Sequence, residues 1–518
     1  MSKLSRRDIL KLTSVAAGGA LAARTLPRRL LRARQADKPN VLILLFDTMS
    51  APHLSLYGYG RATTPNFARL AERATVYHAH YSGGCYTIPG TASILTGLYP
   101  WHHRAVNPGG PVRRDLAGGN LFRAVGTDYY RIGYGQNMWA ELFLRQFHAD
   151  LDLHLPPDSF AFRNPMLLSG INRRDPMAYI AFDDFLVGGV KLDTPYPGAL
   201  TLGVLDLAAA RGRNTDRDLE NRGPRTTPFN GYFYYENRAV FDGIYETIRT
   251  AAGRGQPYLG YFHFWAPHGP YAPTEAFTGL FADGAKVPRK PLHPLIEPKT
   301  ALPDKALDAY SRVYDQYIAN VDAEFGRLLD RLQAEALLDN TWIVLLSDHG
   351  QLFERGVHGH SSRLVYDPGI HVPLLISAPG QSARVDVRVP TSNVDILPSI
   401  VALTGGQPPA RLDGALLPGL GGAGVERPVF AMDAKESSAF RPLDRASFVL
   451  IRGAYKLILY TGYPGYDDLL ELYDLESDPG ELRDLAQSDP ATARRMLDEL
   501  NEARHAADAP FIRPKGNQ

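Results

Sequence analysis

The sequence has little cysteine and no surplus of charge. Among its 518 residues only Cys85 is a cysteine, which excludes an intramolecular disulfide and a cysteine-based zinc cluster. Its 56 Lys and Arg residues are balanced by 55 Asp and Glu residues, a formal net charge of +1. Recognition of nucleic acid needs an excess of basic side chains on one face, so the balance argues against nucleic acid as a partner.

The sequence also lacks a long apolar run. No segment approaches the roughly 20 apolar residues that a membrane span needs, and we expect no stable span. The length allows two to four domains, or one large α/β catalytic domain with an appendage.

The charge is unevenly distributed along the chain. Residues 1–38 contain ten basic and two acidic side chains, a charge of +8, and the rest carries −7. This leader has adjacent Arg6 and Arg7, with Ile9 where the signal motif prefers Phe, a short apolar run over residues 12–23 and an Ala-Leu-Ala pattern at residues 20–22. The order is typical of a twin-arginine export signal, and a disordered basic tail is the alternative. We therefore expect the twin-arginine machinery as a partner and a location beyond the cytoplasmic membrane, in the periplasm, at the cell surface or outside the cell.

Four apolar segments have the character of strands buried in a sheet: Val41–Phe46, Tyr258–Trp265, Thr341–Leu346 and Pro373–Ile376. Helical patterns lie between them, over residues 65–74, 239–252 and 309–336. Strands that alternate with helices predict an α/β fold, with a doubly wound, mostly parallel sheet sandwiched by helices. In such sheets the chemistry collects at the carboxyl ends of the strands.

The chain divides into four predicted parts. These are the signal peptide and basic linker (1–37), a catalytic domain (38–404), a Gly/Pro-rich linker (405–424) and a small C-terminal α+β subdomain (425–518). The subdomain contains a hairpin signal at Arg452-Gly453 and an amphipathic helix over residues 490–507. Residues 203–232 are polar and are predicted to form a surface insertion or a loop on the substrate side.

Two acidic residues stand at predicted strand ends. Asp47 follows the first strand, and Asp348, with His349 after it, follows the strand that ends near Leu346. Thr87 opens a short helix that ends at Gly97, and the free N–H groups and dipole of such a helix favour phosphate or sulfate. The alternative is structural, because Asp and Thr are also common caps of helices and turns.

The chain resembles the sulfatase branch of the alkaline phosphatase superfamily over nearly everything after the leader. The segments that carry the resemblance are Lys38–Val41 and Asp47-Thr48, Tyr57–Tyr59, Thr64–Asn66, Ala92–Pro100, Pro267–Tyr271, Asn320–Asp322, Ser347–Gly350, Gly359-His360, His371–Leu374, Val394–Pro398, Tyr455–Ile458, Glu471–Leu475 and Asp478–Glu481. The resemblance implies an alkaline phosphatase-like fold and a metal-dependent enzyme that acts on ester bonds.

The chain departs from the family in its nucleophile frame. Sulfatases convert a Cys or Ser in a Cys-x-Pro-x-Arg frame to formylglycine, and bind sulfate with that Arg and a later Lys. Here Thr87 stands at the nucleophile position, Thr91 at the Arg and His360 at the Lys, while Cys85 lies two positions too early. Thr cannot give the aldehyde because its β-carbon already bears a methyl group, so no formylglycine is expected. The resemblance points to phosphodiesterases, phosphonate ester hydrolases and phosphoglycerol or phosphoethanolamine transferases.

The resemblance implies one divalent metal ion held by Asp47, Thr87, Asp348 and His349. Such an ion would lower the pKa of the Thr87 hydroxyl and neutralise charge on a phosphoester. Because Thr48 replaces the second acid of many relatives and His349 replaces an Asn, manganese or zinc is favoured, with magnesium or calcium as alternatives. A second metal site could not be assembled from the sequence.

Four histidines are candidates for contact with the substrate. We expect His268 and His360 to bind the non-bridging oxygens or to protonate the leaving group, with Thr91 also on the substrate side. His263 and His358 are alternatives for these roles.

The sequence thus predicts an exported, metal-dependent hydrolase that cleaves phosphate mono- or diesters through a covalent intermediate on Thr87. Its substrate would be a small-molecule or envelope-derived anionic ester. Three alternatives stay open: a sulfuric ester hydrolase, a transferase of phospho groups to cell-envelope acceptors, and a non-catalytic binding protein.

Overall fold

The centre of the molecule is an eight-stranded sheet in the order β13-β2-β12-β9-β1-β8-β4-β5. The computed structural model describes residues 38–160, 227–229, 233–360, 362–466 and 468–512, so the predicted leader and most of the predicted insertion lie outside the described residues. The strands of this sheet are β1 (Asn40–Phe46), β2 (Thr75–Tyr77), β4 (Tyr130–Gly135), β5 (Leu153–Leu155), β8 (Tyr258–Phe264), β9 (Thr341–Ser347), β12 (Leu374–Ser377) and β13 (Val385–Val387). Only β12 runs antiparallel to its neighbours, which confirms the mostly parallel sheet.

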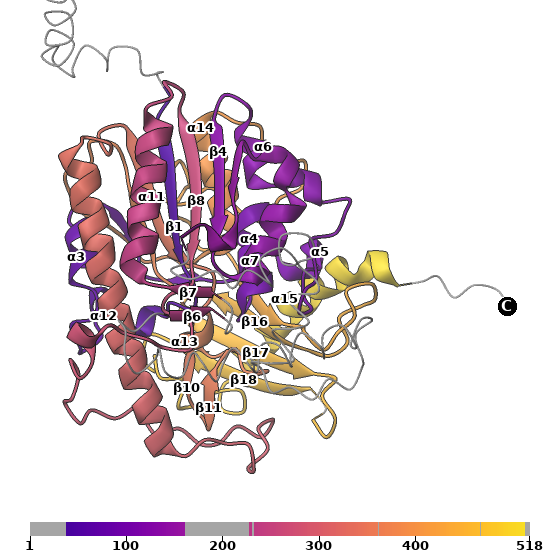
Figure 1. The fold of residues 1–518 in the computed structure, drawn as a ribbon. Coiled ribbons are helices and arrows are strands. Elements are labelled where there is room, and N and C mark those ends of the chain that lie inside the picture. Colours follow the sequence, from indigo (N-terminus) through magenta and orange to yellow (C-terminus); the bar gives the residue numbers. More distant parts are fainter. Residues whose placement is uncertain (1–37, 161–226, 230–232, 361, 467, 513–518) are drawn as a thin grey trace, which may run out of the picture.

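Helices cover both faces of the sheet, as the unbroken apolar strands predict. Even-numbered residues of β1 from Leu42 pack with the helices of one face, and odd-numbered residues from Val41 pack with those of the other. The first face carries α3 (Pro65–Ala71), α11 (Asn237–Ala252) and α12 (Asp304–Ala334); the second carries α4 (Thr87–Thr96), α6 (Leu121–Val125), α7 (Met138–Gln146) and α14 (Ile396–Thr404). Figure 1 shows α11 and α12 in front of the central strands. The three predicted helices and four predicted strands are thus confirmed, with shifted ends.

The remaining elements are short. They are α5 (Pro100–His103), α13 (Asp367–Ile370), and the strand pairs β10 (Leu352–Glu354) with β11 (Val357–Gly359), β3 (His80–Tyr81) with β14 (Thr391–Ser392), and β6 (Thr227–Phe229) with β7 (Phe233–Tyr235). No helix in the described ranges combines the length and the apolar composition needed to cross a bilayer.

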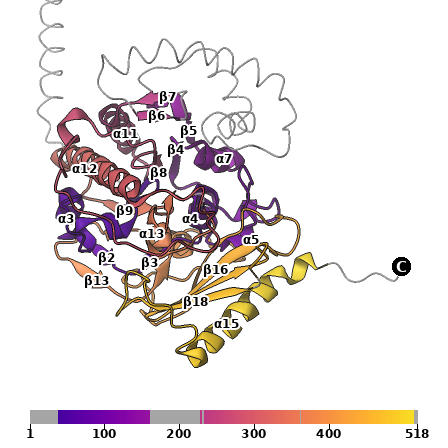
Figure 2. The ribbon, with the colours of Figure 1, turned by 90° about the horizontal axis from the view of Figure 1, so that it is seen from below.

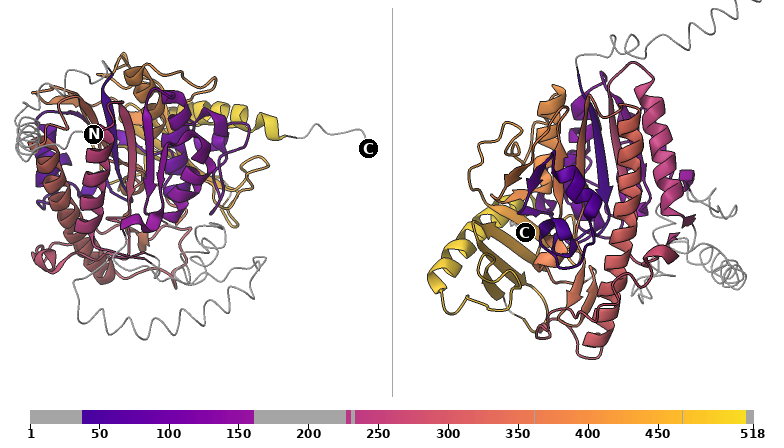
Figure 3. Two further views of the ribbon diagram at one scale, coloured as in Figure 1. Left: turned by 45° about the horizontal axis from the view of Figure 1, so that its top comes forward. Right: turned by 90° about the vertical axis from the view of Figure 1, so that its left-hand side faces the viewer.

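The C-terminal part forms a second, antiparallel sheet. Its four strands are β15 (Val429–Asp433), β16 (Ala446–Arg452), β17 (Tyr455–Thr461) and β18 (Leu469–Asp474), with the predicted hairpin between β16 and β17, and it is followed by α15 (Pro490–Asp508). One face of this sheet packs on the core of the large sheet and the other packs on α15. Figure 2 shows β16, β18 and α15 on the side opposite to α11 and α12, and the right-hand view of Figure 3 shows the same arrangement from the side.

Polar contacts join the two sheets. The buried Lys456 ammonium lies 2.7 Å from Glu481 Oε1 and 3.3 Å from Asp367 Oδ1, and Arg427 donates to the buried Asp395 carboxylate. Residues 405–424, the predicted linker, contact the catalytic part directly, because Gly414 N–H donates to the Gly97 carbonyl (3.2 Å) and Leu417 N–H donates to Ser399 Oγ (2.9 Å).

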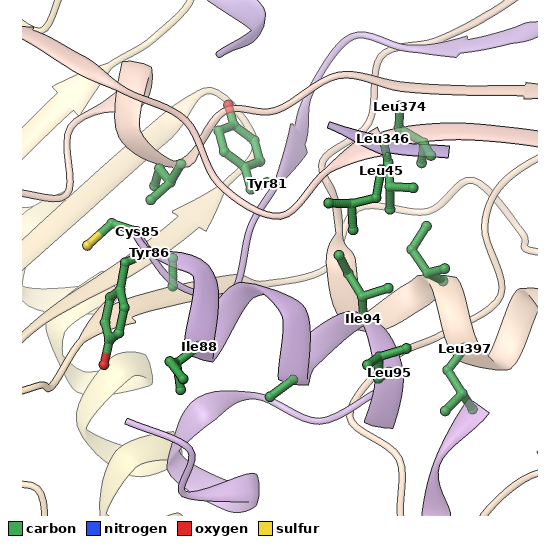
Figure 4. Close-up of a cluster of buried hydrophobic side chains, with 14 of the residues drawn as sticks. Leu45, Tyr81, Cys85, Tyr86, Ile88, Ile94, Leu95, Leu346, Leu374 and Leu397 are labelled. Carbon is green, nitrogen blue, oxygen red and sulfur yellow. The ribbon is translucent and has the colours of Figure 1, made fainter. Parts of the chain in front are cut away.

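Helix α4 lies against the end of β9 without room for a side chain at Gly90. A β-carbon at this position would come within 2.3 Å of the Asp348 carbonyl oxygen, far inside the closest normal contact. Ser82 Oγ donates to the same carbonyl. At the other end of the helix, Ile94 and Leu95 pack into the core beside Leu45 and Leu397 (Figure 4). The first turn of α4 is therefore held next to the residue that follows β9.

We expect Gly90→Ala to displace α4 from Asp348. Overpacking of this kind costs about 1–3 kcal/mol of the free energy of unfolding, more than the gain of up to ~1 kcal/mol from the better helix propensity of Ala. A urea titration measures the loss, and turnover should fall with it. The control is Gly253→Ala, since Gly253 has a φ of −73° and a β-carbon there would meet nothing closer than 3.5 Å. Equal midpoints for the two variants would contradict this account.

Candidate active site

Asp47 and Asp348 lie side by side because of the register between β1 and β9. The last residues of the two strands, Phe46 and Ser347, are paired, so the chain leaves the sheet at neighbouring points. Both carboxylates are fully buried. Thr48 N–H donates to Asp348 Oδ1 (3.3 Å), and Thr48 takes a left-handed φ of 60°, which for a β-branched residue costs on the order of 1–3 kcal/mol.

His349 faces the two carboxylates with its Nε2 atom. Its Nδ1 lies 2.9 Å from the Gly350 carbonyl, and a carbonyl only accepts, so Nδ1 carries a hydrogen. Nε2 lies on the other side of the ring, 3.4 Å from Asp47 Oδ1 and 3.7 Å from Asp348 Oδ2. One possible ligand atom from each of Asp47, Asp348 and His349 lies within 4.8 Å of the others. We call these three residues the acidic triad.

Thr87 is the first residue of α4 and joins the acidic triad. Its Oγ1 lies 3.3 Å from His349 Nε2, and only 3% of the residue is exposed. Thr91, one turn later, is fully buried and donates to Asp348 Oδ2 at 3.5 Å, so in this structure its hydroxyl contacts the triad. The structure thus brings together Thr87 and the three other predicted metal ligands.

Asn137 belongs to the site although no pattern in the sequence pointed to it. Its Nδ2 donates to Asp47 Oδ2 (2.5 Å) and to Thr87 Oγ1 (3.2 Å), and its side-chain oxygen caps α7 by accepting from Trp139 N–H. It follows β4, another parallel strand of the sheet. The rule that parallel strands end at a common edge would have found it, but Tyr130–Gly135 contains two glycines and an arginine and does not have a strand's apolar character.

The histidines predicted to face the substrate lie beside the triad. The rings of His360 and His349 are 4.5 Å apart and those of His360 and His268 are 4.9 Å apart, between centroids. Both His268 and His360 are partly exposed. His268 Nδ1 donates to the Gly269 carbonyl (2.5 Å) and His360 Nδ1 contacts Gln351 Oε1 (2.7 Å), so each Nε2 is the nitrogen left for other contacts.

The two alternative histidines are placed differently. His263, on β8, is fully buried, with Nε2 3.3 Å from Asp47 Oδ2 and 3.6 Å from Asp348 Oδ2, so it adjoins the metal ligands. His358 instead binds the Tyr271 hydroxyl (2.9 Å) and stacks on Tyr310 with centroids 4.0 Å apart.

Two buried carboxylates that lie close together cannot both ionise easily, so the pKa of one is lowered and the pKa of the other is raised. Burial raises the pKa of Asp47, but His268, His263 and His349 outweigh it and hold that pKa well below its usual range. Burial and the charge of Asp47 raise the pKa of Asp348 to about 6. Burial lowers the pKa of His349, but Asp348 and Asp47 outweigh it and raise that pKa. Burial also lowers the pKa of His268, and it lowers the pKa of His360 by a larger amount. Both histidines are therefore neutral at pH 7.

The acidic triad fits a divalent cation. Asp47 Oδ1 is buried and accepts no hydrogen bond, although an unpaired buried charge is costly. Two carboxylates, an imidazole nitrogen and a hydroxyl converge on one place, which is the donor set expected for manganese, zinc or magnesium. The residues present therefore fit the single predicted metal ion.

Comparison with known proteins agrees with this picture. The sequence matches the sulfatase family over residues 39–143 and 191–406, and the C-terminal part of the N-sulphoglucosamine sulphohydrolase family over residues 356–506. It is 24% identical over 486 residues to a choline-sulfatase of Rhizobium meliloti (87% of this chain, 83% of that protein). It is 24% identical over 521 residues to a multifunctional alkaline phosphatase superfamily protein of Trinickia caryophylli (90% and 94%). The fold is similar to the crystal structure of a phosphonate monoester hydrolase of Agrobacterium radiobacter, with a TM-score of 0.65, 20% identity and coverage of 91% of this chain and 96% of that one.

We expect the affinity of the metal-free protein for Mn²⁺ to rise with pH. Protons on Asp348, whose pKa is about 6, and on His349, whose pKa is raised, compete with the cation and are lost as pH increases. The dissociation constant should therefore fall at least tenfold between about pH 5 and about pH 8 and then level off.

Calorimetric titration across this range measures the effect. Asp348→Asn should weaken binding and flatten the pH dependence, while Asp413→Asn should change neither, because Asp413 accepts from Tyr99 N–H (2.7 Å) and binds His102 outside the triad. A wild-type affinity that is independent of pH would contradict the assignment.

Proposed function

The chain belongs to the sulfatase family, as its motifs predicted, and from this premise we propose that it hydrolyses phosphoric mono- or diesters through a covalent intermediate on Thr87. The observation that carries the proposal is the position of the Thr87 hydroxyl, 3.3 Å from His349 Nε2 in the acidic triad. The one cysteine does not compete for this role, because Cys85 Sγ donates to Asp433 Oδ2 (3.3 Å) and not to a residue of the triad. A threonine cannot become formylglycine, so the chemistry is that of an alcohol nucleophile.

Several features support attack by Thr87. It stands at the N-terminus of a ten-residue helix, where the free N–H groups and the dipole stabilise an anionic ester. Asn137 donates to its Oγ1 and to Asp47, so the hydroxyl is held in one position. A bound divalent ion, held by Asp47, Asp348, His349 and Thr87, would lower the pKa of the hydroxyl so that its proton leaves to solvent, and would neutralise the ester's oxygens. In the first step the Thr87 oxygen bonds to phosphorus and the bond to the leaving group breaks.

His268 and His360 are the proposed proton carriers. The leaving alkoxide takes a proton from one of them, and water then attacks phosphorus, gives a proton to a neutral histidine and releases Thr87. Their lowered pKa values keep them neutral, and so basic, in the free enzyme. A bound anionic ester raises these pKa values again, which supplies the acid for the first step.

Two other reactions are alternatives for this site. The choline-sulfatase relative favours a sulfuric ester, whereas the phosphonate monoester hydrolase neighbour and the multifunctional relative favour phosphorus chemistry. A transferase would use the same Thr87 intermediate with an alcohol in place of water. We rank phosphorus first because Thr91 and His360 stand where sulfatases carry the Arg and Lys that bind sulfate.

Export is part of the proposal. The adjacent Arg6 and Arg7, the short apolar run and the Ala-Leu-Ala pattern support passage through the twin-arginine route. That route carries folded chains, which suits a metal bound before export.

We expect Thr87→Ala to lower kcat at least about 10³-fold on aryl phosphodiesters, because the alcohol nucleophile is lost. Thr87→Ser is the matched variant, since it keeps a hydroxyl at the helix N-terminus and should retain much of the activity. The same assays with phosphomonoesters, phosphonate esters and sulfate esters show which ester is preferred. Mass spectrometry of quenched wild-type enzyme should detect a peptide that carries phosphorylated Thr87. Full turnover by Thr87→Ala would remove Thr87 from the mechanism, and a preference for sulfate esters would overturn the choice of phosphorus.

Loss of the proton donor should matter most for poor leaving groups. We expect His268→Ala or His360→Ala to reduce kcat/KM by about 10²-fold or more for an alkyl ester but much less for a nitrophenyl ester, whose leaving group needs no proton. Stopped assays with an ester series measure the slope of rate against leaving-group pKa. His358→Ala is the control, because this ring contacts Tyr271 and Tyr310. An equal loss for all leaving groups would show that both histidines only bind substrate.

A further inference from the structure

The C-terminal sheet places a lysine beside Tyr86, the residue directly before Thr87. Strand β15 ends next to the segment that precedes α4, since Met432 forms a bridge with Gly84 and its N–H donates to the Gly83 carbonyl (3.0 Å). Tyr86 and Thr87 follow directly. The residues after β15 therefore lie at the N-terminus of α4, where the substrate would enter.

Lys435 connects the two segments that carry Thr87 and His360. Its Nζ donates to the Ser362 carbonyl (3.2 Å), two residues after His360, and lies 5.1 Å from the centre of the Tyr86 ring, directly before Thr87. Its side chain is 18% exposed, and His360 is also partly exposed. Its charge is close enough to help lower the pKa of His360.

Asp433 holds this ammonium in place. Asp433 Oδ2 lies 2.8 Å from Lys435 Nζ and accepts from Cys85 Sγ, and Asp433 Oδ1 accepts from Lys435 N–H (3.1 Å). An ammonium has three donors, and within the described part of the chain Asp433 and Ser362 take two of them. One donor is left for a ligand, and the acidic partner keeps the lysine charged.

The substrate side of the site needs such a charge. Thr91 is uncharged and its hydroxyl is turned toward Asp348, so the position where the family carries an arginine brings no cation here. A tetrahedral oxyanion is bound best by charge-assisted hydrogen bonds from a cation. We propose that Lys435 is a substrate-binding residue that donates to an anionic oxygen of the ester, with Asp433 as its positioning residue.

This inference rests on the proposed function, in that the ester binds at Thr87, but it holds for a phosphoric or a sulfuric ester. It also assigns a role to the C-terminal sheet, which contributes a side chain to a site otherwise built at the edge of the large sheet.

The test compares the metal-loaded full chain with Asp433→Asn/Lys435→Met, which removes both charges and leaves no unpaired carboxylate. Inorganic phosphate and sulfate are the probes, as inhibitors of turnover and in calorimetry. We expect the dissociation constant of the preferred anion and the KM of the ester each to rise at least about tenfold, with a smaller change in kcat and an unchanged melting temperature. Lys435→Arg should restore most of the affinity.

The control is Lys290→Met, since Lys290 is another largely buried lysine paired with an acid, but that acid is Glu354 on β10 (2.7 Å) and not Asp433. Wild-type affinity and KM in the double variant would overturn the proposal, as would an equal loss in Lys290→Met. The proposed function fails separately: if no ester is hydrolysed but anion binding still depends on Lys435, the subsite stands without the reaction. If turnover requires Thr87 but does not depend on Lys435, the proposed function stands and the lysine subsite is overturned.

Discussion

The structure depends on the placement of two carboxylates at the ends of neighbouring parallel strands. The register of β1 against β9 brings Asp47 and Asp348 together in the interior, where like charges repel and water is excluded. The strained backbone at Thr48 and the contact of Ser82 with the Asp348 carbonyl hold them there. A divalent cation would relieve this repulsion, and His349 and Thr87 are placed to supply further ligands. Without a cation, the two buried carboxylates of the acidic triad cost stability.

The sequence predicts those parts of the fold and of the site that follow from apolar strands and from the common edge at which parallel strands end. The apolar runs predicted β1 and β9, and because parallel strands end at a common edge, Asp47 and Asp348 could be placed at one site although they are far apart in the sequence. Asn137 was missed because β4 contains Gly133 and Gly135 and is not a simple apolar strand. Lys435 could not be found in this way, since its position depends on how the C-terminal sheet packs beside Gly84, and no local pattern encodes that contact.

The proposed site would bind an anion with few fixed charges. Thr91, His360 and Asn137 are neutral groups, and the helix N-terminus contributes only partial charge. Histidines whose pKa falls on burial change protonation when an anion or a proton arrives, which a guanidinium does not do at physiological pH. In the mechanism that we propose, Lys435 binds the anion, while His268 and His360 carry protons.

The close approach of α4 to Asp348 has a consequence for the evolution of the site. At positions 87 and 91 a substitution changes the group that projects from the helix, but at Gly90 any side chain would push the helix away from β9. The residues at positions 87 and 91 can therefore be substituted one at a time without moving the helix, as long as position 90 remains glycine.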